Sequence, residues 1–222
     1  MNCTAIILAA GASSRMQGTD KQLLSVNGIP VIVRSALNFQ KTSVVSEIII
    51  AAKAELCGEI SELCKKAGIT KLKTVCAGGN TRAESAAMAF SYAGKTDVTL
   101  IHDGARPFAT PEIITAVAEA AQENGGAIAA VAVTDTIKCV KDGFIAFTPE
   151  RSTLYGAQTP QGFRTELYRE MLAQGGDFTD DSQLAEAMGI KVKIVTGSYD
   201  NIKITTPEDI ARAEIIAKKE SL

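Results

Sequence analysis

The feature that most constrains the fold of this chain is a regular alternation between short apolar runs and longer amphipathic stretches. The short runs are rich in β-branched residues and carry almost no charge, which is typical of strands buried on both faces of a parallel sheet. The predicted strands are Thr4–Leu8, Glu47–Ala52, Leu72–Cys76, Val98–His102, Ala127–Val133 and Val192–Val195.

The stretches between these runs carry helix boundary signals. Thr110 can cap a helix N-terminus, Pro30 and Pro111 suit a first turn, and Gly68 suits the position after a last turn. The predicted helices are Pro30–Phe39, Glu55–Ala67, Thr81–Tyr92, Pro111–Asn124, Arg164–Ala173, Asp180–Met188 and one after Pro207. Strands separated by such helices predict right-handed βαβ crossovers, and therefore an α/β fold with a mainly parallel sheet.

The alternation breaks after Val133. Residues 134–160 have no helical period, and they read as two short strands around the turn Lys141-Asp142-Gly143, followed by an irregular return. Long excursions of this kind are usually functional or form interaction arms. We therefore expect a single domain over 1–222 from which 134–160 protrudes.

Composition excludes several classes of protein. The net charge of −2 gives no basic surface for nucleic acid, and no apolar run approaches the length of about 20 residues that spans a bilayer. The chain has one histidine and five scattered cysteines, so neither a structural zinc site nor a disulfide framework is expected. The N-terminus lacks the basic segment of a signal peptide, and a cytoplasmic location is expected.

The loop after the first predicted strand, LAAGASSRMQGTDK, is a candidate nucleotide cradle. Its small residues, among them Ala9, Ala10 and Gly11, allow backbone N–H groups to approach an anion, while Arg15 and Lys21 supply charge. The loop matches neither the Walker pattern nor the dinucleotide fingerprint. A solvated β–α turn is the structural alternative.

Two further motifs fall at the same predicted edge of the sheet. In HDGARP, Asp103 is placed to hold Mg²⁺ against a polyphosphate, although a turn carboxylate is the alternative. His102 is expected to be a hydrogen-bonded structural residue rather than a general base.

In the motif GGNTR, the glycines allow a flat ring to approach, and Asn80 and Ser85 could read a base edge. A plain turn with a helix cap is the alternative. Lys203, near the last helix, could complete a cationic cluster.

The ordered motifs LAAGxSxRM, GGNxR, HDGARP, DTIK, AQTPQ, TDD and NIKITTPED, with Lys21 six residues after Arg15, span essentially the whole chain. Together they resemble the cytidylyltransferases of the non-mevalonate isoprenoid pathway, which act on 2-C-methyl-D-erythritol 4-phosphate. Single motifs are shared with the wider sugar nucleotidyltransferase group, but the ordered set is more specific.

The resemblance implies a Rossmann-like three-layer α/β/α domain, a homodimer formed through the 134–160 arm, and CTP and Mg²⁺ as substrate and cofactor. It also implies residue roles. CTP would be bound by Ala9, Ala10, Gly11, Arg15, Lys21, Gly79, Asn80, Ser85 and Ala105. Methylerythritol phosphate would be bound by Asp103, Arg106, Thr136, Arg151, Thr179, Asp180 and Lys203. Asp103 would hold the metal, and Arg15, Lys21, Arg151 and Lys203 would be catalytic, with Thr136 and Arg151 supplied by the partner's arm.

Three residues depart from the pattern of many relatives. Leu8 and Asp20 stand where proline is common, and Asn80 stands where aspartate is common. Asn80 keeps a carbonyl acceptor for cytosine or ribose but loses the charge of the aspartate.

Three other functions remain as alternatives. A cytidylyltransferase for ribitol 5-phosphate or another polyol phosphate would share the opening loop, the Arg-Pro after the fourth predicted strand and the NIK segment, whereas HDGARP, DTIK and TDD look closer to the isoprenoid branch. A nucleotide-binding sensor without turnover could use the same fold, although it would be expected to have lost part of the charge set. A uridylyl- or adenylyltransferase would differ in the few contacts near Asn80.

Overall fold

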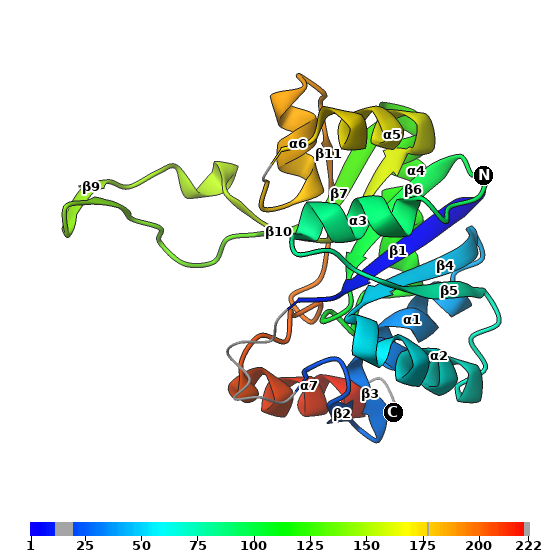
Figure 1. Ribbon diagram of the computed structural model, residues 1–222. Helices are drawn as coiled ribbons and strands as arrows, with labels where there is room; N and C mark the ends of the chain where they lie inside the picture. The colour runs from blue at the N-terminus through cyan, green and yellow to red at the C-terminus, as the bar shows by residue number, and fades with distance from the viewer. Residues whose placement is uncertain (12–19, 177, 220–222) are drawn as a thin grey trace.

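The computed structural model describes residues 1–11, 20–176 and 178–219. Their main feature is one sheet of seven strands in the order β11-β7-β10-β6-β1-β4-β5, in which β10 alone runs antiparallel to its neighbours (Figure 1). The strands are β1 (Cys3–Ala9), β4 (Val45–Ala52), β5 (Leu72–Ala77), β6 (Val98–Asp103), β7 (Gly126–Ala132), β10 (Tyr155–Arg164) and β11 (Lys193–Thr196). The predicted fold class, an α/β fold with a mainly parallel sheet, is confirmed.

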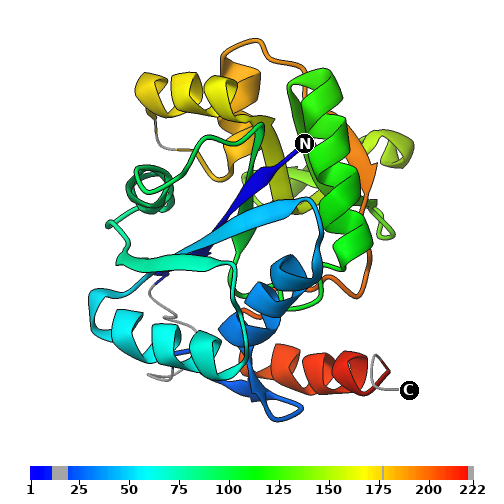
Figure 2. The same cartoon turned by 90° about the vertical axis from the view of Figure 1, so that its right-hand side faces the viewer.

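Helices cover both faces of the sheet, which gives three layers (Figures 1 and 2). One face carries α1 (Val31–Lys41), α2 (Cys57–Lys66) and α4 (Pro111–Asn124). The other carries α3 (Arg82–Phe90), α5 (Thr165–Gln174) and α6 (Asp181–Ala187). The last helix, α7 (Pro207–Lys219), packs beside the small hairpin of β2 (Ser25–Val26) and β3 (Ile29–Pro30). None of the described helices is long and apolar enough to cross a membrane.

Side chains of the central strands alternate between the two faces, as the pleat of a strand requires. In β1, Ala5 and Ile7 join the core under α1, α2 and α4, whereas Ile6 joins the core under α3. All three are fully buried, and apart from Thr4 the strand is apolar. This explains why the first strand reads as a continuous hydrophobic run in the sequence.

The helix boundaries follow the predicted signals closely. Thr81 and Glu84 form a capping box at the start of α3, and the side chain of Thr110 accepts from the backbone of Ile113 at the start of α4. Gly68 follows α2 with a φ of 74°, a left-handed conformation that suits glycine. Local sequence therefore sets where these helices begin and end.

The irregular return predicted up to residue 160 extends only to Leu154, and the prediction is wrong beyond it. Residues from Tyr155 onward form β10, which pairs with β7 and then inserts between β7 and β6. Pro160 interrupts the pairing, and the register shifts between Ala157 and Gln161. A proline inside a central strand is unusual, which is why the sequence did not predict one here.

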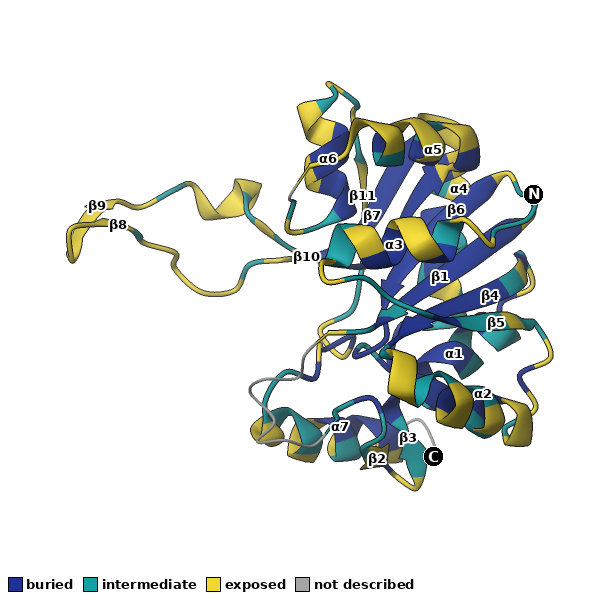
Figure 3. Cartoon of the chain, viewed as in Figure 1, coloured by how far each residue is buried: buried dark blue, intermediate teal, exposed yellow. Residues whose placement is uncertain are grey.

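The segment before β10 projects from the body of the molecule, and most of it is exposed (Figure 3). Its tip is the hairpin of β8 (Cys139–Lys141) and β9 (Phe144–Phe147), with a short helical turn η3 (Arg151–Thr153) on the way back. Asp142 and Gly143 both have positive φ, as a two-residue hairpin turn requires. The predicted pair of short strands around this turn is confirmed.

Candidate active site

A cavity of about 440 Å³ opens at the carboxyl ends of four parallel strands. Ala10 and Gly11 follow β1, Lys53 follows β4, Gly79 follows β5, and Asp103 ends β6. Because these ends meet at one edge of the sheet, residues far apart in the sequence line a single site, which is where open α/β sheets bind their ligands.

Asp103 is the only acidic residue among the described residues that line this cavity. Its carboxylate lies 2.8 Å from Lys203 Nζ, 3.6 Å from Arg106 Nε and 4.0 Å from Arg82 Nε. Burial alone would raise the pKa of Asp103, but Lys203, Arg82 and Arg106 hold it at about 2. The carboxylate is therefore ionised at neutral pH and surrounded by positive charge.

Lys203 is held over Asp103 by backbone contacts on either side of it. Ile204 N donates to Ala105 O at 2.8 Å, and Arg106 Nη1 donates to Asn201 O at 2.8 Å. These bonds fix the segment after β11 to the turn after β6. The Lys203 side chain is still 43% exposed, so it can reach a ligand in the cavity.

The glycine loop after β5 is tightly packed. A Cβ at Gly78 would lie 2.5 Å from the Cβ of Ala10, so only glycine fits between the two loops. The Ser85 hydroxyl accepts from Gly79 N at 3.1 Å and donates to Thr81 O at 2.8 Å. Ser85 therefore holds the loop in shape, while the exposed Asn80 lines the cavity beside it.

His102 is fully buried behind the cavity and is fully hydrogen-bonded. Its Nε2 donates to Arg106 O at 2.9 Å, because a carbonyl can only accept, and its Nδ1 accepts from Thr159 Oγ1 at 2.9 Å. Burial lowers the pKa of His102 to about 4. The ring is neutral at physiological pH and supports the turn that follows Asp103, in agreement with the structural role predicted for it.

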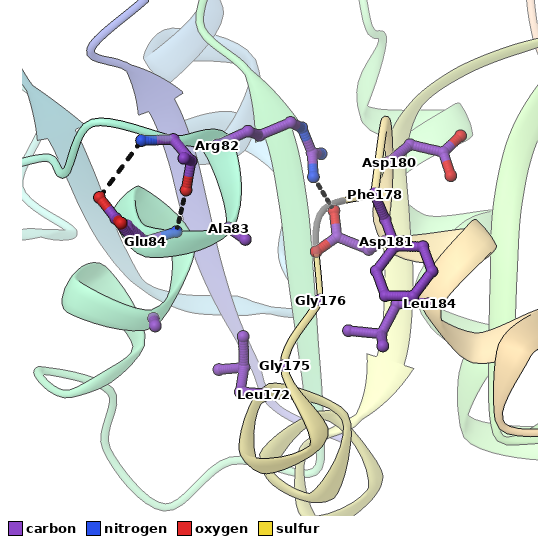
Figure 4. Close-up of a pocket in the computed structure, with 12 residues that line it drawn as sticks. Arg82, Ala83, Glu84, Leu172, Gly175, Gly176, Phe178, Asp180, Asp181 and Leu184 are labelled. Carbon is purple, nitrogen blue, oxygen red and sulfur yellow. Dashed lines mark hydrogen bonds and ion pairs between the residues drawn. The ribbon is translucent and has the colours of Figure 1, made fainter.

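A second cavity, also of about 440 Å³, lies on the other side of Arg82 (Figure 4). Figure 4 shows Arg82 reaching from α3 to Asp181 at the start of α6, where the two form an ion pair. Asp181 also accepts from the hydroxyl of buried Tyr168 at 2.9 Å. Burial would lower the pKa of Arg82, but Asp181 and Asp103 raise it above its ordinary value. Arg82 therefore lines both cavities as a permanent charge.

The structure brings most of the predicted site residues together. The described residues of that set that line the first cavity are Ala10, Gly11, Lys21, Gly79, Asn80, Ser85, Asp103, Ala105 and Lys203. Ala9 is buried at the end of β1 beneath them, and Arg106 lies beside Asp103. Arg15 lies outside the described residues.

Four predicted acceptor-site residues lie elsewhere. Asp180 caps α6 by accepting from Gln183 N at 2.9 Å, and it lines the second cavity rather than the first. Thr179 donates to the Gln183 side chain. Thr136 and Arg151 are exposed on the projecting arm, where Arg151 Nη1 donates to Thr134 O at 3.1 Å.

Sequence reasoning missed four residues of this region: Gln22, Lys53, Arg82 and Asp181. Arg82 and Asp181 stood inside the motifs GGNTR and TDD, but only the three-dimensional structure shows that they pair. Gln22 follows Lys21 and is nearly fully buried against the cavity. Lys53 has no motif around it, and the end of a predicted strand was its only signal.

The comparisons with known proteins agree with one another. Residues 3–219 match the family model "IspD: 2-C-methyl-D-erythritol 4-phosphate cytidylyltransferase". The chain is 41% identical to the 2-C-methyl-D-erythritol 4-phosphate cytidylyltransferase of Bacillus licheniformis, over 99% of this chain and 97% of that protein.

Two solved structures are similar over nearly their full length. The 4-diphosphocytidyl-2C-methyl-D-erythritol synthase of Anaerococcus prevotii superposes with a TM-score of 0.87 at 32% identity, covering 98% of this chain and 96% of the other. The 2-C-methyl-D-erythritol 4-phosphate cytidylyltransferase of Thermus thermophilus gives 0.79 at 30% identity, covering 98% and 100%.

Proposed function

This chain belongs to the IspD family of 2-C-methyl-D-erythritol 4-phosphate cytidylyltransferases, and on that premise we propose how its residues divide the work of the reaction. The enzyme transfers CMP from CTP to 2-C-methyl-D-erythritol 4-phosphate and releases pyrophosphate. The observation that carries the proposal is the cationic setting of the first cavity, where Lys21, Arg82 and Lys203 line the same space as Asp103, the single carboxylate among the described lining residues.

The acceptor's phosphate oxygen attacks the α-phosphorus of CTP in line, and pyrophosphate leaves. The nucleophile is already an anion at neutral pH, since the second pKa of a phosphate monoester is about 6. The reaction therefore needs no general base. The buried, neutral and fully bonded His102 fits this scheme, because it has no free nitrogen to offer.

The nucleotide half of the site is built from the body of the fold. Ala10, Gly11 and Gly79 bring backbone close to the nucleotide, and Asn80 and Ser85 lie where the base would be read. Lys21 contacts the phosphates and acts mainly on the charge that develops as pyrophosphate departs. Arg15 has the same role in this proposal.

The acceptor half is organised around Asp103. Lys203 bridges the two substrates, because its partly exposed side chain lines the cavity while the segment around it is fixed to the turn after β6. Arg106 is tied to the Asn201 and Ala157 carbonyls, so it holds this turn and keeps Asp103 ionised. The fixed charges lower the repulsion between two polyanions, which is the main electrostatic obstacle to the reaction.

Among its described lining residues, the cavity offers Mg²⁺ one carboxylate ligand, that of Asp103. Mg²⁺ in nucleotide sites commonly takes one or two carboxylates and fills its remaining positions with phosphate oxygens and water. Asp103 offers one ionised carboxylate, and the described residues contain no cluster of three or more acidic, histidine or cysteine side chains. Asp103 would be the protein's ligand, and the bound ion would neutralise charge on the triphosphate.

We also propose that the 134–160 arm pairs two copies of the chain. The hairpin at its tip exposes Val140, Phe144, Ile145 and Phe147, and the Phe144 side chain is 79% exposed. An apolar cluster on a projecting segment indicates a protein partner. The arm also carries Thr136 and Arg151, which suit an acceptor phosphate but lie away from the cavity of their own chain. A second copy satisfies both observations, because each arm then completes the other's site.

The cysteines support a cytoplasmic location. All five are unpaired in the structure, and burial raises the pKa of Cys3 to about 12 and that of Cys64 to about 11. Such thiols behave as small buried hydrophobic groups and suit a reducing compartment.

The direct test is pyrophosphate release from CTP and Mg²⁺ with methylerythritol 4-phosphate and ribitol 5-phosphate offered in parallel. The proposal predicts a strong preference for the first acceptor. Preference for ribitol 5-phosphate would keep the mechanism and change the substrate. Tight CTP binding without release with either acceptor would identify a nucleotide sensor and overturn the proposed reaction.

A further inference from the structure

Lys53 has no role in the reaction as described above, yet it lines the same cavity as Lys21 and Asp103. It is the first residue after β4, and its Nζ lies 2.7 Å from Asp20 Oδ2. The side chains retain only 27% and 12% of their exposure, so this pair is much less solvated than an ordinary surface ion pair.

The carboxylate of Asp20 organises the turn that presents Lys21. Asp20 Oδ1 accepts from Gln22 N at 3.0 Å, and the backbone carbonyl of Asp20 accepts from Leu23 N at 3.1 Å. Gln22 O in turn accepts from Ile32 N at 3.0 Å, which fastens the turn to α1. The orientation of the Lys21 backbone therefore depends on where the Asp20 carboxylate is held.

Lys53 holds that carboxylate from a rigid position. The residue before Lys53 is Ala52, the last residue of β4. Ala52 pairs with Ala9 of β1, and its carbonyl accepts from Gly78 N at 2.8 Å. The carbonyl of Lys53 accepts from Leu56 N at 2.9 Å and begins the short helix η2 (Ala54–Leu56). The side chain of Lys53 thus connects the end of the central sheet to the turn of Lys21.

Lys53 also neutralises the charge of the Asp20 carboxylate. Asp20 Oδ2 is buried and has no hydrogen bond within the described part of the chain, so the ion pair with Lys53 is its compensation there. Without Lys53, an unpaired carboxylate would stand next to Lys21 and repel an approaching triphosphate. Unpaired buried charges are costly, and they also distort the turn that bears them.

We propose that Lys53 is a positioning residue for the nucleotide: through Asp20 it holds and neutralises the turn that presents Lys21 to the phosphates of CTP. This inference rests on the proposed phosphate contact of Lys21. It differs from a direct contact between Lys53 and the nucleotide, because in the positioning role every effect of Lys53 passes through Asp20.

The two roles predict different outcomes in a set of four variants. In the positioning role, Lys53→Met raises KM for CTP by about tenfold, and KM for the acceptor stays within about twofold. Lys53→Arg restores the nucleotide KM, because it keeps the charge. Asp20→Asn changes KM for CTP by less than about threefold, since asparagine still accepts from Gln22 N and leaves no unpaired anion. The double variant Asp20→Asn/Lys53→Met resembles Asp20→Asn and binds CTP better than Lys53→Met does.

The matched control is Lys73→Met, which breaks the 2.8 Å ion pair between Lys73 and Glu47 on the same sheet but outside the cavity. Thermal unfolding of each variant separates loss of stability from loss of nucleotide affinity, and CTP binding measured without acceptor gives a readout independent of turnover. Wild-type turnover in the same assay tests the proposed function itself.

Three results would overturn the inference while wild-type turnover stands. The first is a double variant as impaired as Lys53→Met, which would show that Lys53 acts on CTP without Asp20. The second is Asp20→Asn binding CTP more tightly than wild type, which would mean that Asp20 merely holds Lys53 back from a direct contact. The third is a Lys53→Met protein with a normal KM for CTP.

Discussion

The cavity at the sheet edge and the projecting arm both supply residues to the proposed site, and they are built in opposite ways. The fold fixes the cavity region: three cations hold Asp103, hydrogen bonds on either side hold the Lys203 segment, and lack of space fixes Gly78 in the loop before Gly79. Arg151 and Thr136 are exposed on a segment whose apolar tip faces solvent (Figure 3). In the proposal, the nucleotide half belongs to one chain, whereas the acceptor half combines Asp103 and Lys203 of the cavity with Thr136 and Arg151 from the arm of a second copy.

This difference separates two kinds of variant. Changes in the cavity alter the reaction in every molecule, however concentrated the enzyme is. In the proposed dimer, changes in the arm act through the partner, so their effects should depend on protein concentration and should be corrected by another subunit. The predictions below use this distinction, beginning with the largest effect.

The largest effect is expected at Lys21. Lys21→Ala should lower kcat by about 10³-fold, because a fixed charge that acts on the leaving pyrophosphate contributes mainly in the transition state. Steady-state kinetics measures this, and thermal unfolding should show a fold close to wild type. A kcat within about threefold of wild type would remove Lys21 from the catalytic set.

The buried histidine should make stability depend on pH. His102 has a pKa of about 4 in the fold, below its usual value of about 6.5, because burial disfavours its charged form. The unfolded chain therefore binds a proton first as pH falls, so the stabilisation is complete above about pH 6.5 and is lost between there and about pH 4. The loss should approach about 3 kcal/mol in the free energy of unfolding.

Chemical denaturation at pH 7 and pH 4.5 measures this loss. Because carboxylates also titrate in this range, the comparison is between wild type and His102→Gln, which should lose less stability as pH falls. Equal pH dependence in the two proteins would mean that His102 does not carry a buried, neutral ring in solution.

A smaller effect is expected at the tip of the arm. Phe144→Ser with Ile145→Ser should leave the cavity intact but weaken the dimer, because both side chains are exposed in the single chain and would be buried only against a partner. We expect about a tenfold loss of activity at nanomolar enzyme and recovery at high concentration. Light scattering across the same range checks the oligomeric state, and a wild-type profile in both assays would contradict a dimer formed through this hairpin.

The sequence predicted the body of the fold well and the contacts across it less well. Local signals predict strands such as β1 and helices such as α4. An apolar run marks β1, and Thr110 and Gly125 mark the two ends of α4. β10 carries Pro160 and several polar residues, so its place in the centre of the sheet comes from pairing with β6 and β7 rather than from its own propensity.

In the site, too, local motifs were predicted well, whereas contacts between distant residues were not. Motif residues at strand ends, such as Asp103 and Gly79, were predicted to share one edge and do so. The partnerships of Lys53 with Asp20 and of Arg82 with Asp181 join residues that are 33 and 99 positions apart, and no local pattern predicts such pairs. The assignment of Thr179 and Asp180 to the acceptor pocket stays a prediction; in this structure Asp180 caps α6 and Thr179 donates to the Gln183 side chain.

The most direct test of the shared site is complementation between two inactive variants. Lys203→Ala removes a residue of the cavity, and Arg151→Ala removes a residue of the arm. Mixed, unfolded and refolded together in equal amounts, they should form heterodimers in which one site carries both changes and the other carries neither, so that about a quarter of all sites regain wild-type activity. Activity no higher than that of the separate variants, with dimers present, would contradict a site assembled from two chains.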